Sequence, residues 1–361
     1  MKRIKHKPLA VLIVISLIVA SLMVFSFGCM KKEEKEIKIG AILPLTGDFA
    51  ILGEEIKKGI ELAIEETKST GLPLIVFYED DQSLSPVAGV NAANKLITVN
   101  KIDVGLTMIV EESRPISSFF GKSKVPLIVL WDSNKFIKED GEYIFSNGFS
   151  TEKAGEKMAE FAFSKLGLRK FAIIKHVDPW AEIISESVET KIRNSGGTIV
   201  LKETLQPTDT DYRTAISKIK KAGPDSVYVA LVPPNSSLFL IQAKELGVRV
   251  PLLTGDALIQ QVIDAAGKSA EGAYLTNIYT ESNNATLLTE KYKNKYKKAP
   301  FDIALVSFGY DGIMKVAEAM KLHKRTLQEA LISIFGENRS ADRIEKIYRI
   351  INGKPVEVEV E

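Results

Sequence analysis

The residue types that could carry catalysis are few in this 361-residue chain, and their spacing does not bring them together. The three histidines, His6, His176 and His323, are far apart, and no HExxH spacing offers a metal site. Cys29 is the only cysteine, and no GxSxG motif marks a nucleophilic serine. The loop at residues 44–53 contains neither GxGxxG nor the GK(S/T) of a phosphate-binding loop. We therefore predict no catalysis and no cofactor, since a hydrolase on an α/β scaffold would lack its nucleophile.

A different set of residues could bind a small charged molecule. The carboxylate of Asp256 follows a short apolar run, so it could pair with an ammonium group at the end of a strand. Backbone N–H groups near Val110 and Ser133 could bind a carboxylate. Trp131 and Trp180, the only two tryptophans, offer flat apolar walls that also attract cations. A zwitterion that leaves water needs both charges met, because burying an unpaired ion costs several kcal/mol.

Each of these residues also has a structural interpretation. Asp256 could cap a helix that starts near Ala257, because aspartate is a favoured N-cap residue. Ser133 could be an ordinary strand-end or capping serine, and both tryptophans could pack in a core. A backbone contact places little demand on the residue type at Val110.

Acidic clusters occur at residues 79–81 and at Glu111 and Glu112. Such clusters without other ligand types are more often solvated loop ends than catalytic pairs, so we expect them to face solvent. Glu111, Glu112 and Asp132 would be unusual beside a carboxylate site. The alternative is that they indicate a ligand with extra positive charge or with no carboxylate.

Apolar runs and amphipathic segments alternate along the chain and define the elements that must hold these residues. Strands are predicted at residues 37–43, 74–78, 104–110 and 126–130, with helices at 52–67, 86–99 and 114–121. The rhythm restarts after about residue 150, with strands at 170–175, 198–203, 225–231, 251–254 and 272–278. Asn352–Gly353 predicts a hairpin between a final pair of strands. This order indicates an α/β fold with two parallel sheets, which bind ligands at the carboxyl ends of their strands.

Composition agrees with a two-domain globular protein. About 330 residues follow Cys29, more than one hydrophobic core usually supports. The formal charge is +2, with basic and acidic residues interspersed, so no nucleic-acid partner is indicated. No cysteine follows Cys29, so no disulfide can form within the folded part.

The first 36 residues are typical of an exported protein. A basic start precedes an uncharged run at residues 9–27, and small residues lead to Cys29. This resembles the lipobox of lipoproteins, although Ser26 stands where leucine is usual, and it implies cleavage before Cys29 and acylation of its sulfur. The alternative is an uncleaved membrane helix, for which ~20 apolar residues suffice. Both interpretations place the folded part outside the cytoplasmic membrane.

The chain resembles type 1 periplasmic binding proteins, in the branch that carries branched-chain amino acids and related amino acids or amides. The resemblance begins at residues 39–47 (IGAILPLTG) and continues through Gly53 and Gly59. It extends through residues 145–148 (FSNG) to the Tyr310–Asp311 pair, and so covers the chain after the leader. It implies two Rossmann-like lobes with parallel sheets, joined by a hinge.

The resemblance also implies site residues, position by position. One carboxylate-binding segment of the family matches Val110, where the usual serine hydroxyl is missing. The next one matches Trp131 and Ser133. Trp180 matches an aromatic residue that closes over the ligand, and Asp256 matches the carboxylate that binds the ammonium. Leu52 and Val232 stand where tyrosine is common, which leaves branched-chain specificity open and makes an aromatic or bulky apolar ligand as plausible.

The implied function is a lipid-anchored, monomeric solute-binding protein that delivers a small amphiphilic ligand, an amino acid or related compound, to an ABC permease with its ATPase subunits. The alternative is a sensor with the same fold. The expected domains are a signal peptide at 1–28, a tether at 29–36, a first lobe at 37–149 and 279–340, and a second lobe at 150–278 and 341–361.

Overall fold

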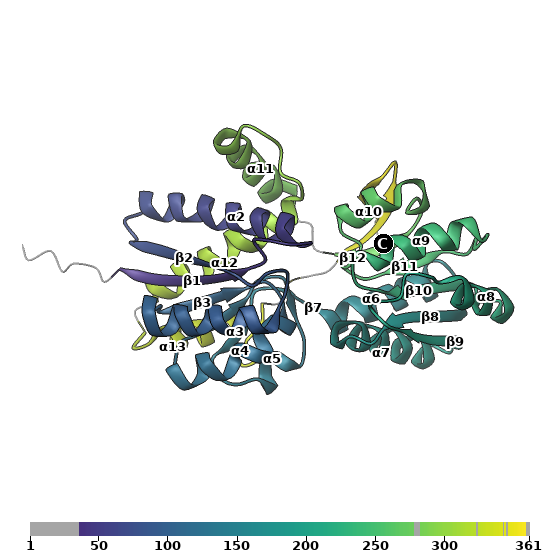
Figure 1. Cartoon of the computed structure of the whole chain (residues 1–361), viewed down its shortest axis with the longest axis horizontal. Helices are drawn as coiled ribbons and strands as arrows, with labels where there is room; N and C mark the ends of the chain where they lie inside the picture. Colours follow the sequence, from purple (N-terminus) through teal and green to yellow (C-terminus); the bar gives the residue numbers. More distant parts are fainter. Residues whose placement is uncertain (1–35, 278–281, 323, 342, 344–345, 359–361) are drawn as a thin grey trace, which may run out of the picture. The chain divides into compact units, whose positions relative to one another are not determined.

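The computed structural model describes residues 36–277, 282–322, 324–341, 343 and 346–358. The chain divides into two units, Met1–Glu36 and Ile37–Glu361, and the second contains every helix and strand described below (Figure 1). The predicted leader and Cys29 lie outside the described residues. In the described part, no helix combines the length and apolar character needed to cross a membrane.

The first sheet has five parallel strands in the order β2-β1-β3-β4-β6. They are β1 (Ile37–Leu43), β2 (Leu74–Asp80), β3 (Val104–Thr107), β4 (Leu127–Val129) and β6 (Ile144–Ser146). Burial on both faces explains their apolar character, because helices cover both sides of a parallel sheet. A separate parallel pair is formed by β5 (Asp132–Ser133) and β7 (Phe149–Ser150).

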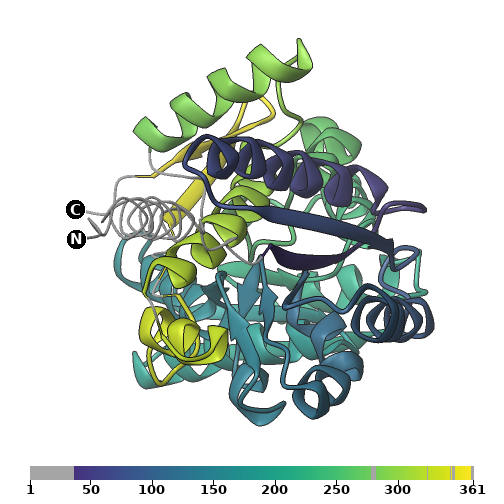
Figure 2. The same cartoon turned by 90° about the vertical axis from the view of Figure 1, so that its left-hand side faces the viewer.

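Helices from both ends of the described chain surround this first sheet (Figures 1 and 2). The early ones are α2 (Ala50–Ser69), α3 (Pro86–Lys95) with a π-helical extension (Leu96–Asn100), α4 (Val110–Ser123) and α5 (Phe136–Glu139). The late ones are α11 (Ser282–Tyr296), α12 (Ile303–Lys321) and α13 (Leu327–Phe335). A small cluster of Leu62, Leu288, Tyr292 and Val306 joins α2 to α11 and α12.

Glycines let α2 and α12 approach backbone to backbone. A Cβ atom on Gly59 would lie 1.9 Å from the carbonyl oxygen of Val306, and one on Gly309 would lie 2.0 Å from that of Ile56. No side chain fits at such distances, so this helix pair depends on both glycines. The pairing attaches a late segment of the chain to the first sheet.

The second sheet has seven strands in the order β14-β13-β12-β11-β10-β8-β9. Five are parallel, β8 (Lys170–His176), β9 (Thr198–Leu205), β10 (Ser226–Ala230), β11 (Leu252–Thr254) and β12 (Tyr274–Asn277). The last two, β13 (Lys346–Ile351) and β14 (Lys354–Glu357), form the antiparallel hairpin predicted at Asn352–Gly353. Both turn residues have positive φ, 52° and 70°, as a tight hairpin turn requires.

The helices that cover the second sheet alternate with its strands along the chain, beginning with a helix before β8. They are α6 (Thr151–Ser164), α7 (Pro179–Asn194), α8 (Arg213–Ala222), α9 (Asn235–Glu245) and α10 (Gln260–Ala266), with a 3₁₀ turn (Gly267–Ser269). The α/β fold with parallel sheets in two lobes is therefore as predicted, whereas the residue boundaries of the lobes remain a prediction.

Candidate functional site

A cavity with a volume of about 430 Å³ lies where strands of both sheets end. In the first lobe its lining follows β1 at Phe49 and Leu52, β2 at Asp81, β3 at Glu111 and β4 at Trp131. In the second lobe it follows β8, β10 and β11 through the segments described below. A cavity of ligand size therefore lies at the carboxyl ends of parallel strands, where the binding site was predicted.

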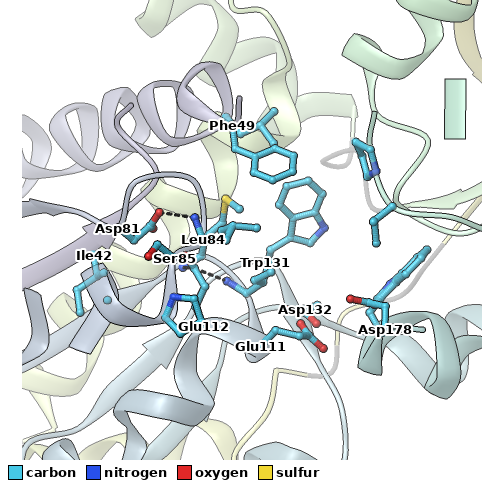
Figure 3. A pocket seen from close by; sticks show the side chains of 18 of the residues that line it. Ile42, Phe49, Asp81, Leu84, Ser85, Glu111, Glu112, Trp131, Asp132 and Asp178 are labelled. Atoms are coloured by element: carbon cyan, nitrogen blue, oxygen red, sulfur yellow. Dashed lines mark hydrogen bonds between the residues drawn. The ribbon is translucent and has the colours of Figure 1, made fainter. Parts of the chain in front are cut away.

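Aromatic side chains form much of the apolar lining. Phe49 and Trp131 contribute from the first lobe (Figure 3). Trp180 contributes from the second. The ring of Trp131 packs against Phe308 with centroids 5.4 Å apart, which holds it in place. Its indole Nε1–H has no hydrogen-bond partner among the described residues, although Trp131 is only 7% exposed.

Six carboxyl side chains line the same cavity, and no lysine, arginine or histidine of the described residues does so. They are Asp81, Glu111, Glu112, Asp132, Asp178 and Asp256. The expectation that the acidic clusters face solvent is therefore wrong for the residues at the cavity. Asp81 is 1% exposed and Asp132 2% exposed, and Figure 3 shows Glu111 and Asp178 pointing toward one another.

Glu112 has a structural task at the start of α4. Its Oε2 accepts hydrogen bonds from the Thr107 hydroxyl at 3.1 Å and from the N–H groups of Met108 and Ile109 at 3.0 and 3.2 Å. Burial first, and then Asp81 beside it, raise the pKa of Glu112 well above its ordinary value. Two neighbouring carboxyl groups cannot both be charged at low cost, so Asp81 adds to the effect of burial on Glu112.

Asp132 bridges β5 to α4. Its Oδ1 accepts the backbone N–H of Val110 at 2.9 Å. The sequence predicted Val110 at the end of a strand, but β3 ends at Thr107 and Val110 is the first residue of α4. The side chain of Val110 is buried in a core, and the residue does not line the cavity. The amide expected to bind a ligand's carboxylate is therefore already bonded to a carboxylate of the chain.

Asp256 is held by Trp180, with the indole Nε1–H donating to Oδ1 at 3.0 Å. The capping alternative for Asp256 is wrong, because α10 begins only at Gln260, where Ile259 precedes it and no side chain caps it. Asp178, by contrast, is the N-cap of α7, and its Oδ1 accepts the N–H of Ala181 at 3.0 Å.

Burial in the cavity wall disfavours the charged form of several of its carboxyl groups. Burial, followed by the charges of Asp178 and Asp256, raises the pKa of Glu111 to about 7. Burial and the neighbouring Glu111 raise the pKa of Asp132 well above its usual range. The pKa of Asp178 is raised by burial. A cation placed among these groups would relieve the cost of ionising them.

The described residues contain no group of three or more histidine, cysteine, aspartate or glutamate side chains that could hold a metal ion. The carboxyl groups are spread over several strand ends and interleaved with indole faces. Such a lining suits an organic cation, which meets both carboxylates and aromatic faces.

Five of the seven predicted binding residues line the cavity, namely Leu52, Trp131, Trp180, Val232 and Asp256. Val110 and Ser133 do not, and Ser133 is 5% exposed within β5. Sequence reasoning missed Phe49 and Asp178. The Asp178–Pro179 pair could have been read as a helix start at a strand end, because aspartate favours the N-cap and proline the first helical position.

Comparisons with known proteins give one consistent picture. Residues 36–336 match the family model described as periplasmic binding protein. The Leu/Ile/Val-binding protein homolog 3 of Brucella melitensis is 26% identical over 266 residues, which are 72% of each chain. A leucine-binding protein, LivK, from Thermotoga maritima superposes with a TM-score of 0.81 at 24% identity, covering 90% of this chain and 98% of that one. A solute-binding protein of an ABC transporter from R. palustris, solved with 4-hydroxybenzoate, gives a TM-score of 0.80 at 20% identity, covering 91% and 96%.

Proposed function

From the premise that this chain belongs to the type 1 periplasmic binding proteins of the branched-chain amino acid ABC transporter family, we propose that it captures a small apolar amine, an amino acid or related compound. The family implies an extracytoplasmic location and ABC transporter partners, and it consists of solute-binding proteins rather than enzymes. The bound ligand would be handed to a membrane permease driven by ATPase subunits.

One observation carries the choice of an amine. The cavity combines indole and aliphatic walls with six carboxyl groups, and no cationic side chain of the described residues lines it. An ammonium group entering this space gains carboxylate partners, while its hydrocarbon part meets the walls. A ligand whose only charge is negative, such as the 4-hydroxybenzoate bound by the R. palustris protein, would instead meet repulsion.

The anchoring of the protein is proposed from the sequence alone. Cleavage before Cys29 and acylation of its sulfur would tether the folded part through residues 30–36. Mass spectrometry of the protein extracted from membranes would detect the acylated N-terminal cysteine. If the wild-type chain retains its leader in the membrane, and a Cys29→Ser variant does the same, the alternative of an uncleaved membrane helix is favoured.

The function is tested by ligand screening with the full chain in a mild detergent. Thermal unfolding would be recorded with apolar amines, amino acids, carboxylic acids and sugars, each at high excess. Mass action predicts about 2.7 kcal/mol of stabilisation at a hundredfold excess over the dissociation constant. We expect stabilisation by compounds with an ammonium group and an apolar body, and none by benzoate-type acids.

The amine assignment is wrong if no amine or amino acid stabilises the protein while an acid or a sugar does. Glu337 provides a charge control, because it is exposed and does not line the cavity. A Glu337→Gln variant should keep the wild-type ligand profile, since removing a surface charge outside the cavity changes little at ordinary salt.

A further inference from the structure

The start of α4 faces the cavity with its donors already used by the chain itself. Glu112 accepts the N–H groups of Met108 and Ile109, and Asp132 accepts that of Val110. Helix starts attract anions because their first N–H groups lack partners within the helix. Here two carboxylates of the chain accept the N–H groups of Met108 and Ile109, just before α4, and of Val110, its first residue, so an anionic group of a ligand would have to displace a carboxylate to reach them.

The second lobe repeats this arrangement. The first turn of α7 lines the cavity at Trp180, and Asp178 accepts the N–H of Ala181. No positive side chain of the described residues lines the cavity to balance these carboxyl groups. Arg114 is on α4, but its guanidinium lies 3.4 Å from Asp140 and 3.5 Å from the ring centroid of Phe136. A ligand carboxylate would therefore meet negative groups and helix starts that are already capped.

One hydrogen-bond donor in the cavity wall has no partner among the described residues. It is the buried indole Nε1–H of Trp131, whose side chain lines the cavity (Figure 3). A buried donor without a partner is costly, and a neutral acceptor on a ligand would satisfy it. Trp131 and Asp132 line the same cavity, so one ligand can meet the donor with an acceptor and the carboxyl with an ammonium.

We propose that the ligand is an organic cation without a carboxylate, which carries an ammonium group, an apolar body and one uncharged hydrogen-bond acceptor, as an amino-acid amide does. Asp132 holds the position where the carboxylate of a zwitterion would bind. The inference rests on the proposed function, because it narrows the class of amine that the cavity accepts. The acceptor pairs with Trp131, and the ammonium lies among Glu111, Asp132 and Asp256.

Matched ligands separate the two classes of amine. L-Leucine and L-leucinamide, and L-phenylalanine and L-phenylalaninamide, differ only in whether the acceptor is a carboxylate or a neutral amide. Isothermal titration with the full chain in detergent would be run near pH 7, where an α-amine of pKa about 8 is mostly protonated. We expect each amide to bind at least about tenfold more tightly than its parent amino acid.

Two variants assign this preference to named residues. Asp132→Asn keeps an oxygen that can accept the Val110 N–H but removes the charge, so the preference for the amide should shrink by about tenfold or more. Trp131→Phe keeps an apolar wall but removes the donor, so leucinamide should weaken while a simple alkylamine of similar size should not. Glu337→Gln is the control for the loss of one negative charge and should leave the preference unchanged.

The outcomes are distinguishable from a failure of the proposed function. If leucine binds as tightly as leucinamide, or more tightly, the inference is overturned while the capture of amines stands. If neither the amides nor any other amine binds, the proposed function itself fails. If Asp132→Asn unfolds, Asp132→Ser, which also removes the charge, replaces it, and an unchanged preference in a folded variant contradicts the role of Asp132.

Discussion

The indole Nε1–H of Trp180 donates to Oδ1 of Asp256 at 3.0 Å, joining residues that are 76 positions apart in the sequence. Trp180 is the second residue of α7, and Asp256 follows β11, a strand elsewhere in the same sheet. The bond fixes the direction of a carboxylate that is 6% exposed at the cavity wall. Trp180 and Asp256 are therefore held together as one hydrogen-bonded pair at the cavity wall.

Replacing either member of this pair should weaken an amine ligand. We expect Asp256→Asn to reduce affinity about 10–100-fold, because it removes a buried charge that would pair with the ammonium. Trp180→Phe should cost about tenfold or less, since it keeps an aromatic face but releases the carboxylate. Isothermal titration measures both, with thermal melts of the ligand-free variants to verify folding. Unchanged affinity in a folded Asp256→Asn variant would assign that carboxylate a structural role only.

The pKa of Glu111 predicts how stability depends on pH. Burial, with the nearby charges of Asp178 and Asp256, raises this pKa from 4.5 to about 7. Between those values the unfolded chain has lost the proton while the folded protein keeps it, so the free energy of unfolding falls as pH rises through this window. Glu111→Gln should remove that loss and stabilise the ligand-free protein at neutral pH by on the order of 1–3 kcal/mol.

The same substitution at Glu66 provides a control of opposite sign. Hydrogen bonds from Lys291 and Tyr310 hold the pKa of Glu66 below its ordinary value. Glu66→Gln should therefore lower stability at neutral pH, by an amount that vanishes in acid. Denaturant unfolding at several pH values measures both variants. A loss of stability in Glu111→Gln at neutral pH would contradict the assigned pKa.

Binding of a cation should be linked to the same proton. An ammonium near Glu111 favours the charged carboxylate, so binding lowers the pKa of Glu111 and releases a proton near neutral pH. Affinity should rise as pH increases through about 7, as long as the ligand itself stays protonated. Titration calorimetry in buffers of different ionisation enthalpy counts the protons released. Glu111→Gln should release fewer, and an equal release would place the titrating group elsewhere.

The contact between α2 and α12 predicts a strong effect at a glycine remote from the cavity. A Cβ atom on Gly309 would lie 2.0 Å from the carbonyl oxygen of Ile56, so Gly309→Ala should destabilise the protein by about 2 kcal/mol or more. Gly121 is the matched control, because it lies in α4 with no atom within 4 Å of a Cβ atom placed there. Gly121→Ala should stabilise by about 0.5–1 kcal/mol. Denaturant unfolding measures the stability of both variants. If Gly309→Ala leaves the free energy of unfolding unchanged, α2 and α12 can move apart to make room for the methyl group.

The three hydrogen bonds to Glu112 predict different costs for two substitutions. Glu112→Ala leaves the N–H groups of Met108 and Ile109 without their acceptor, which should cost about 1–3 kcal/mol. Glu112→Gln keeps an oxygen in place and removes a charge that burial disfavours, so it should cost less. Equal losses in the two variants, measured by denaturant unfolding at neutral pH, would show that the charge matters more than the acceptor.

Local pattern predicted most of the fold. The strand at Ile37–Leu43 lies where the apolar run placed it, and Ile56, Ile60 and Ala63 face the core as their helical spacing indicated. The Asn352–Gly353 hairpin is also present, because the two residues adopt the positive φ that the turn requires. Such features depend on neighbours in the sequence, so the sequence is sufficient to find them.

The boundary at Val110 could not be predicted in the same way. Its apolar run continues the pattern of β3, but Glu112 accepts N–H groups at the following turn and starts α4 at that point. Asp132, 22 residues later, then takes the Val110 amide. Residues from separate elements decide this boundary, and apolar periodicity contains no information about them.

The sequence by itself determined the α/β class, the repeated sheets, the family and five residues of the cavity wall, because periodicity and short motifs act locally. Only the tertiary structure decided where the acidic residues lie. Acidic residues spread from Asp81 to Asp256 meet at one cavity, since the carboxyl ends of parallel strands gather side chains from distant segments. Burial then raises the pKa of groups that the sequence suggested were solvated, and these groups form the lining that we propose binds a cation.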